Sequence, residues 1–367
     1  MKSFRICRMV IVLLAIFVIT FSGCTGKTKK AVQKQTQIEK PAVDVESPVP
    51  AVENPQAVPE KPAPTFEKQE TTKAPAVSAK TVPMVLKFST GEITKYKVIM
   101  EGQRKVKWDG AVPNKPSFQS GETRNKAEMT FTQKIQSVTG SGNAFALITI
   151  DQLKYVSSIK ETQVLDFDSS RAEDTNTPMA RLIGQSYTIE ITPSAEVAKV
   201  VDVNSALAAV KGDSSAQRAA MRLLEPEIIR ERHGTLRLPS SETQLTVGAK
   251  WKNTKTFSYG WMGSLTYERI YTLKDVEDHK ATVDMEAVPA TEPNNPSSSR
   301  LAKNFDHKGR YWGQLHFDTA KGEVTRYSET IQEDWLVAKP SEEQGSEGEP
   351  TALTMSASRF YSIEKIE

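Results

Sequence analysis

Histidine is the side chain best suited to acid–base catalysis and metal binding at neutral pH, and this chain has four. None of them is spaced as a HExxH motif or as an i, i+4 pair, which would place two ligands on one helix face. His307 follows Asp306, and His316 lies two residues before Asp318, so each pair offers the groups of an acid–base or metal site. The simpler interpretation is that His316 and Asp318 share the solvent face of one strand and that His307 lies in a loop.

Other catalytic patterns are missing from the sequence. No serine lies in a Gly-x-Ser-x-Gly elbow, and no glycine-rich phosphate-binding loop is present. Residues 166–170 contain aspartates and serines that offer oxygen ligands to calcium, but they lack the spacing of an EF-hand loop and fit a polar turn better. We therefore expect a protein that is not an enzyme and that uses no metal and no cofactor.

The chemistry that the sequence indicates most clearly is lipid attachment to a cysteine. Residues 1–23 begin with a cationic stretch and continue with an apolar run at residues 9–21, as in a secretory signal peptide. That run is shorter than the roughly 20 residues of a membrane-spanning helix, so an uncleaved anchor helix is the weaker alternative. The cysteines are Cys7, which would leave with the signal peptide, and Cys24, so no disulfide is expected in the mature protein.

The stretch Phe21-Ser22-Gly23-Cys24 resembles the lipobox of bacterial lipoproteins. The resemblance implies cleavage before Cys24 and attachment of fatty acyl chains such as palmitate, and two or more such chains anchor a protein firmly to a membrane. Phe21 stands where leucine is usual. Thr25 stands where an aspartate often signals inner-membrane retention, which favours the outer membrane weakly. We therefore expect a cell-envelope protein, anchored to the membrane and facing the periplasm or the exterior.

Residues 24–83 have the composition of a flexible tether. They contain nine of the twenty prolines, and Phe66 is their only aromatic residue. Such a segment buries too little apolar surface to offset the entropy of ordering it, so we expect it to be disordered. It is either a spacer or a segment that threads another envelope layer such as the cell wall. The cations of residues 1–23 account for the whole net charge of +3, so the mature chain offers no basic patch to nucleic acid.

The rest of the chain, residues 84–367, is dominated by period-two alternation, as in residues 129–136 and 186–192. This pattern indicates strands with one buried and one solvent face, so we expect a mainly β fold of antiparallel curved sheets or a half-barrel.

Residues 203–234 break the alternation with helical periodicity, and Pro226 should kink or restart a helix there. This helical insert separates a first β unit, residues 84–202, from a second, residues 235–367, within what we expect to be one compact domain.

The two β units resemble each other in the order of their motifs. Each opens at a glycine, Gly91 or Gly248, and each later contains a Gly-Gln strand, at Gly184 and Gly313. This order favours a duplicated unit. The buried faces after the two Gly-Gln pairs differ by one residue, so a duplication would need a bulge or a slip. Convergent alternation, which any antiparallel protein shows, is the alternative.

Residues 86–366 are similar to an uncharacterised family of bacterial lipoproteins, a domain of unknown function. The shared features are Gly91 with the aromatic strand at Tyr96, the Gly-Gln strand that leads to Glu196-Val197, Leu238-Pro239, and the stretch from Gly248 to Trp251. The family implies no activity. More distantly, a curved antiparallel sheet with a helical insert is similar to half-barrel carriers of lipids and lipoproteins, which is an analogy of fold.

Aromatic residues are the candidates for ligand recognition. Phe257, Tyr259 and Trp261 share one face of an expected strand, and that face would suit an apolar ligand if it lines a concave sheet. Ordinary core packing is the default for such rings. We expect a binding protein that holds a lipid-like ligand in a dry cavity behind these rings. The alternative is a structural scaffold that binds another envelope protein or the cell wall, with a filled core and an exposed apolar patch.

Overall fold

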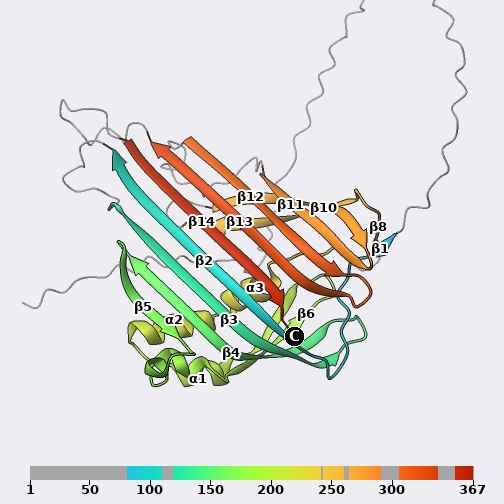
Figure 1. Cartoon of the computed structure of the whole chain (residues 1–367), viewed down its shortest axis with the longest axis horizontal. Coiled ribbons are helices and arrows are strands. Elements are labelled where there is room, and N and C mark those ends of the chain that lie inside the picture. The colour runs from blue at the N-terminus through green and yellow to red at the C-terminus, as the bar shows by residue number, and fades with distance from the viewer. Residues whose placement is uncertain are drawn as a thin grey trace, which may run out of the picture. The chain divides into compact units, whose positions relative to one another are not determined.

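Alternating buried and exposed side chains build the strands of one large antiparallel sheet (Figure 1). The structure is a computed structural model, and it describes residues 81–109, 119–240, 243–259, 264–290, 306–337 and 352–366. The strands of this 12-stranded sheet are β2 (Ile93–Asp109), β3 (Gly121–Val138), β4 (Ala144–Ile159), β5 (Thr162–Asp168), β6 (Ser186–Ile191), β7 (Val197–Asp202), β9 (Lys250–Ser258), β10 (Ser264–Glu277), β11 (Lys280–Pro289), β12 (Asp306–Asp318), β13 (Glu323–Val337) and β14 (Ala352–Lys365).

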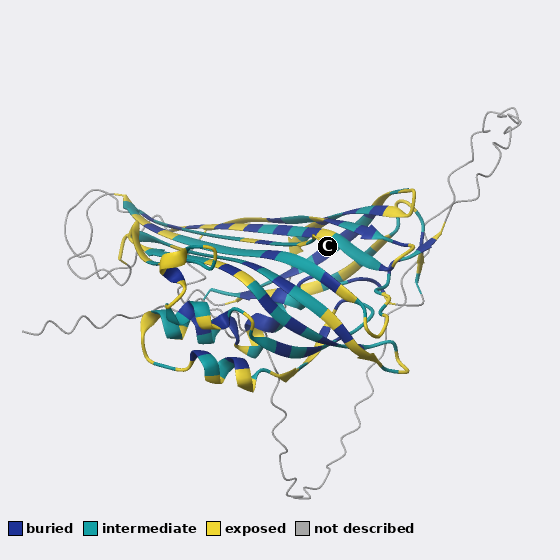
Figure 2. Cartoon of the chain, turned by 60° about the horizontal axis from the view of Figure 1, so that its bottom comes forward, coloured by how far each residue is buried: buried dark blue, intermediate teal, exposed yellow. Residues whose placement is uncertain are grey.

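The alternation seen in the sequence is confirmed in these strands. Met129, Phe131 and Ile135 of β3 are buried, and so are Tyr187 and Ile189 of β6. Because successive side chains of a strand point to opposite faces, each of these strands presents one apolar face to the core and one to solvent. The sheet is strongly curved, and buried residues alternate with less buried ones along its strands (Figure 2). The expected mainly β fold with a curved antiparallel sheet is therefore confirmed.

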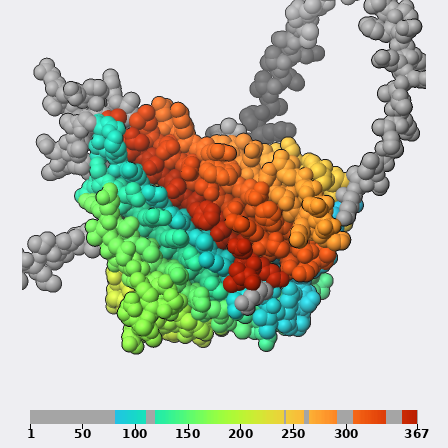
Figure 3. Space-filling view, in the orientation of Figure 1, coloured from blue at the N-terminus to red at the C-terminus, as the bar shows by residue number. Residues whose placement is uncertain are grey.

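The C-terminal strand β14 lies in the middle of the sheet. It pairs with β2 on one side and with β13 on the other, so it joins the strands that precede the helices to those that follow them (Figure 3). The strand order is β7-β6-β4-β3-β2-β14-β13-β12-β11-β10-β9, and β5 pairs with β4. A separate two-stranded sheet joins β1 (Val82–Pro83) to β8 (Gln244–Leu245).

The helical insert is also confirmed, as α1 (Asn204–Val210), α2 (Ser215–Leu223) and α3 (Pro226–Gly234). Ser214 begins α2 with a capping box, because its side chain accepts from the Gln217 N–H and the Gln217 side chain accepts from the Ser214 N–H. Pro226 stands in the first turn of α3, where its missing N–H costs nothing, so it restarts the helix. Two 3-10 turns, Ala172–Asp174 and Pro178–Leu182, precede β6. Within the described ranges, no helix is long and apolar enough to cross a membrane.

Arg232 connects α3 to the inner face of the sheet through hydrogen bonds. Its side chain is 1% exposed and donates to the Tyr187 hydroxyl of β6 at 2.9 Å and to the Leu223 carbonyl of α2 at 2.6 Å. The Tyr361 hydroxyl of β14 donates in turn to the Arg232 carbonyl at 2.7 Å. Because each hydrogen bond crosses between different elements, α2 and α3 are held at a fixed position over the sheet.

The same turn precedes the strands of each half. Gly91, before β2, and Gly248, before β9, both have φ +88°, a conformation that glycine adopts without strain. The Gly91 N–H donates to the Ile135 carbonyl of β3, and the Gly248 N–H donates to the Leu273 carbonyl of β10, both at 2.8 Å. The register shift between β12 and β13 at His316 and Phe317 leaves Thr325 of β13 as the extra residue, so it does not account for the one-residue difference between the Gly-Gln strands. Duplication itself stays a prediction, which superposition of residues 86–200 and 245–337 tests.

Candidate functional site

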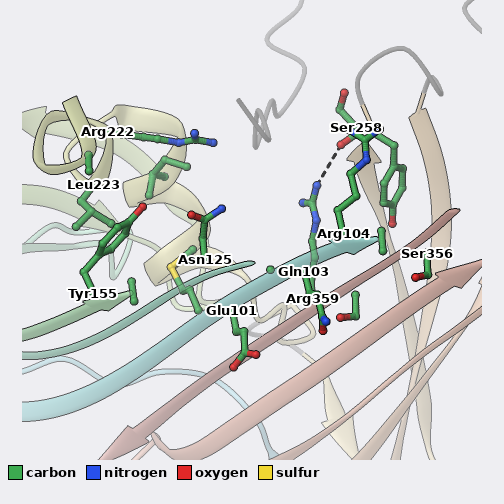
Figure 4. A pocket seen from close by; sticks show the side chains of 18 of the residues that line it. Glu101, Gln103, Arg104, Asn125, Tyr155, Arg222, Leu223, Ser258, Ser356 and Arg359 are labelled. Atoms are coloured by element: carbon green, nitrogen blue, oxygen red, sulfur yellow. Dashed lines mark hydrogen bonds between the residues drawn. The ribbon is translucent and has the colours of Figure 1, made fainter. Parts of the chain in front are cut away.

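A cavity of about 120 Å³ lies between the inner face of the central strands and the helices (Figure 4). We call it the helix–sheet cavity. Strands β2, β3, β4, β9, β13 and β14 and helices α2 and α3 contribute to its walls. The larger apolar side chains among its lining residues are Met100, Tyr155, Leu223, Tyr259, Trp335 and Met355. The cavity is therefore mainly apolar, as pockets for small molecules usually are.

The space exists because three neighbouring strands carry small residues at their inner positions. Met100 and Gly102 of β2 are the register partners of Ala127 and Asn125 of β3. On the other side of β2, Arg104 is the partner of Ala357 of β14. Gly102, Ala127 and Ala357 all line the cavity. The hydrogen bonds of Arg232 fix the positions of α2 and α3 relative to the sheet. The helices therefore cannot move closer to these small side chains, and a void remains.

Three arginines lie in the walls of this cavity, on three different elements: Arg104 on β2, Arg222 on α2 and Arg359 on β14. Figure 4 shows Arg222 extending from one side toward the space that Arg104 and Arg359 face from the other. Arg359 donates to the Ser258 carbonyl at 3.1 Å, and its guanidinium lies 5.2 Å from the ring centre of Phe257. Burial lowers the pKa of Arg104, because a guanidinium that is partly removed from water loses part of the hydration that favours its charged form.

A smaller cavity, of about 20 Å³, adjoins the first and shares Met100, Glu101 and Arg359 with it. Glu231 of α3 and Glu329 of β13 both line it. Burial raises the pKa of Glu231, while the positive charges of Lys255 and Arg359 act in the opposite direction.

Behind this small cavity lies a buried network centred on the Glu329 carboxylate. Lys255 of β9 donates to it at 2.7 Å, Tyr311 of β12 at 2.6 Å and Tyr327 of β13 at 2.7 Å, and Arg269 of β10 lies at 3.3 Å. Burial alone would raise the pKa of Glu329, but the charges of Lys255 and Arg269 and these hydrogen bonds lower it. The carboxylate is therefore ionised and fully paired, which suits a structural role.

A second buried carboxylate corrects one sequence expectation. His307 does not lie in a loop: it is in β12, and its Nε2 contacts the carboxylate of Glu333, a side chain that is 0% exposed. Tyr267 donates to the same carboxylate. His316 and Asp318 do share one face of β12, as expected, and both are partly exposed. Within the described ranges, no group of three His, Cys, Asp or Glu side chains is placed to hold a metal ion.

The structure separates the aromatic residues that the sequence singles out. Tyr259 lines the helix–sheet cavity, where its ring lies 5.0 Å from that of Trp335. Phe257 lines the small cavity instead and packs edge-on against Tyr311 with ring centres 5.4 Å apart. Trp261 and the lipidation candidate Cys24 lie outside the described residues.

None of the three arginines is recognisable as a site residue by sequence reasoning alone. Their convergence depends on the pairing of β14 with β2 and on the placement of α2, which local patterns do not encode. One signal was available: Gly102 interrupts a strand, and a glycine inside a strand often marks a place where a ligand or another backbone approaches closely.

The comparisons with known proteins show a family but no activity. The model of a family of unknown function (DUF6263) matches residues 141–324, half of the chain. No curated protein matches the chain in sequence. A solved structure of lipovitellin, described under "Lipid-protein interactions in lipovitellin", has a TM-score of 0.36 and 9% identity and covers 77% of this chain and 26% of its own. This chain thus spans about a quarter of that one.

Two further solved structures show weaker likeness. DynF, from the dynemicin biosynthesis pathway of Micromonospora chersina, has a TM-score of 0.18 and 7% identity, and covers 82% of this chain and 94% of its own. OpdL of Pseudomonas aeruginosa has a TM-score of 0.18 and 7% identity, and covers 75% of this chain and 99% of its own.

Proposed function

The chain belongs to the DUF6263 family, and we propose that it is a non-enzymatic binding protein that holds a lipid-like molecule in the helix–sheet cavity. The observation that carries the proposal is the cavity itself, about 120 Å³ between the inner sheet face and α2 and α3. For comparison, an apolar cavity of about 150 Å³ engineered into another protein binds benzene. The space therefore suits a ring or a bent segment of an acyl chain, with the rest of the ligand continuing beyond it.

The walls support a reversible binder of apolar groups. Met100 and Met355 supply flexible, polarisable side chains that adapt to ligands of different shape. Tyr259 and Trp335 supply large apolar surfaces, and a ligand that covers them gains about 25 cal/mol for each Å² removed from water. The buried carboxylates of Glu329 and Glu333 are engaged by neighbouring side chains and lie outside the lining of this cavity.

The proposal includes the place where the protein works. The lipobox-like stretch that ends at Cys24 supports an acyl anchor, and the proline-rich residues 24–83 support a tether between the membrane and the sheet. A binding protein on such a tether would take up lipid-like molecules close to the surface of the cell envelope, with the outer membrane favoured weakly.

The experiment is a fluorescence titration in which Trp335 reports on the cavity. The full chain is reconstituted in phosphatidylcholine nanodiscs and titrated with 9,10-dibromostearate, whose bromine atoms quench indole fluorescence on contact. We expect saturable quenching that is largely lost in Trp335→Phe, because Trp335 lines the cavity. Trp312→Phe is the matched control, since Arg310 stacks on this ring at 4.6 Å and the residue does not line the cavity. Quenching that is absent, or equal in the two variants, would contradict the proposed function.

A further inference from the structure

We infer that the ligand of the helix–sheet cavity is a lipid-like molecule with an uncharged oxygen acceptor, such as an ester or amide carbonyl, which accepts a hydrogen bond from the Tyr259 hydroxyl. This inference rests on the proposed function and names the chemical class of the ligand. Two observations on one residue carry it: Tyr259 lines the apolar cavity, and its hydroxyl is buried without a hydrogen-bond partner among the residues that the structure describes.

The Tyr259 ring is held among buried side chains on the inner side of the sheet. The residue follows directly after β9, two positions beyond the buried Phe257, and the two ring centres lie 6.5 Å apart. Trp335 of β13 meets the Tyr259 ring edge-on at 5.0 Å, and the Arg359 guanidinium lies 5.5 Å from its centre. The hydroxyl stands at the far end of a ring that is fixed by these contacts, so its position is defined before a ligand arrives.

A buried hydroxyl without a partner is costly. The group gives up its hydrogen bonds to water when the chain folds, and nothing in the described part of the chain replaces them. Such groups are rare in native proteins, and a site for a bound molecule is one explanation of them. The cavity that Tyr259 lines brings a ligand to this residue, and a ligand oxygen that accepts the hydrogen bond removes the cost.

The charges around the hydroxyl favour an uncharged acceptor. Burial raises the pKa of Tyr259, the negative charge of Glu333 raises it further, and the positive charge of Arg359 acts less strongly in the opposite direction. The hydroxyl therefore keeps its proton at physiological pH and can donate it. An anion placed against it would be repelled by Glu333, whereas a carbonyl oxygen accepts the hydrogen bond without adding a second negative charge.

The apolar surface beside Tyr259 determines the rest of the ligand. Trp335 and Met355 belong to a buried apolar cluster against which Tyr259 and Ala357 pack, and all four residues line the cavity. A small polar molecule would leave these surfaces uncovered. A carbonyl joined to an alkyl chain covers them and pairs the hydroxyl at the same time, and acyl esters and acyl amides have this combination.

The test compares two competitors with alkyl chains of matching length, methyl stearate and octadecane, of which methyl stearate alone has a carbonyl. Each displaces 9,10-dibromostearate from the full chain in phosphatidylcholine nanodiscs, and the recovery of Trp335 fluorescence measures its affinity. Each competitor is compared with itself in the wild type and in a variant, so its partition into the nanodisc lipids cancels.

The variants assign the effect to one hydroxyl. Tyr259→Phe removes the hydroxyl and keeps the ring, so methyl stearate should bind about fivefold more weakly, as for the loss of one uncharged hydrogen bond, and octadecane should bind unchanged. Tyr271→Phe is the matched control, because the Tyr271 hydroxyl is also buried but the residue does not line the cavity. It should leave both affinities unchanged.

The stability of Tyr259→Phe separates a role in binding from a role in the fold. Urea denaturation should show no loss of stability, since no described residue hydrogen-bonds to the hydroxyl that is removed. A loss of stability would show that the hydroxyl has a partner within the folded protein, and it would overturn the inference.

Two further outcomes would overturn the inference and leave the proposed function in place. Equal changes in affinity for methyl stearate and octadecane in Tyr259→Phe, or no change for either, would show that the hydroxyl does not bind the ligand. An equal loss of methyl stearate affinity in Tyr271→Phe would show that the effect does not come from the cavity. If 9,10-dibromostearate does not quench Trp335 in the wild type, the proposed function fails and this inference fails with it.

Discussion

Gly102 of β2 lies directly opposite Arg359 of β14 in the register of the sheet. The same arrangement occurs twice between β12 and β13, where Gly309 is the partner of Glu333 and Gly313 is the partner of Glu329. In each case a residue without a side chain faces a long charged one on the inner side of the sheet. An added Cβ would collide with the Glu333 carboxylate at Gly309 and with the Ser328 carbonyl oxygen at Gly313, so these two glycines are required for the space they leave.

Gly313→Ala tests this relationship in the paired network. A Cβ atom at Gly313 would lie 2.5 Å from the Ser328 carbonyl oxygen and 3.0 Å from the Met285 Cε. We expect a loss of about 1–3 kcal/mol in the free energy of unfolding, measured by urea denaturation, because a packed core resists added volume. Gly140→Ala is the control, since nothing lies within 4 Å of its Cβ position. Equal losses of unfolding free energy in the two variants would contradict the claim that the space at Gly313 is required.

The Glu329 network should contribute far more to the free energy of unfolding than an ion pair at the surface. Glu329→Gln leaves Lys255 and Arg269, which are 16% and 3% exposed, without their counter-charge. We expect a loss of about 3–5 kcal/mol, as for other broken buried pairs. Glu268→Gln removes the partner of the exposed Lys252 and should cost less than about 1 kcal/mol. Urea denaturation of both variants at neutral pH measures the difference, and a small effect of Glu329→Gln would contradict the network.

Glu231 should make stability depend on pH in the direction opposite to an ordinary paired acid. Burial raises its pKa in the folded protein above the unfolded value of about 4.3. Its contribution to stability is therefore greatest below about pH 4.3 and is lost as pH rises through the folded pKa. Glu231→Gln should be more stable than the wild type at pH 7, and this gain should shrink toward pH 4.

The control for this pH profile lies on the same helix. Glu227 is 44% exposed and faces Arg230 at 3.7 Å, so Glu227→Gln should show no such gain at pH 7. Thermal unfolding at a series of pH values compares the two variants with the wild type. A Glu231→Gln variant that is less stable than the wild type at pH 7 would show that the carboxylate has a stabilising partner.

Filling the helix–sheet cavity should abolish binding with little damage to the fold. Ala127 lines the cavity, and Ala127→Phe places a ring in the existing space. We expect loss of dibromostearate quenching and a change of less than about 1.5 kcal/mol in stability, because the added volume meets a void. Lys126→Phe, one residue earlier and on the opposite face of β3, should bind as the wild type does. Unchanged quenching in Ala127→Phe would place the ligand elsewhere.

The anchor is tested by Cys24→Ser. If Cys24 receives acyl chains, the variant should lose lipid modification and move from the membrane fraction to the soluble fraction. Metabolic labelling with palmitate, followed by fractionation of the envelope, measures both changes. Processing and membrane attachment that do not change would contradict the lipoprotein interpretation.

Local sequence patterns predicted the strands and helices better than they predicted the residues that line the helix–sheet cavity. Alternation placed Met129, Phe131, Tyr187 and Ile189 on the buried face, and Pro226 marked the restart of a helix, because these signals depend on neighbouring residues. The central place of β14 was not predictable in this way. Its pairing with β2 joins residues far apart in the chain, and period-two alternation is the same in every strand.

The role of the aromatic residues stays a prediction. The structure places Tyr259 in the lining of the helix–sheet cavity and Phe257 in that of the smaller one, which shows where they lie and not what they bind. The arginines were missed because a charged residue on a strand usually marks a solvent face. Only the inward register of Arg104 and Arg359, set by the sheet, reverses that interpretation.

The central claim is that the helix–sheet cavity holds a lipid-like ligand, and native mass spectrometry tests it most directly. The full chain is purified from the cells that produce it, and its lipids are extracted in parallel, for the wild type and for Ala127→Phe. The account predicts one lipid-like molecule for each wild-type chain and none on the variant. A wild-type chain without bound lipid, or the same lipid on both proteins, would contradict it.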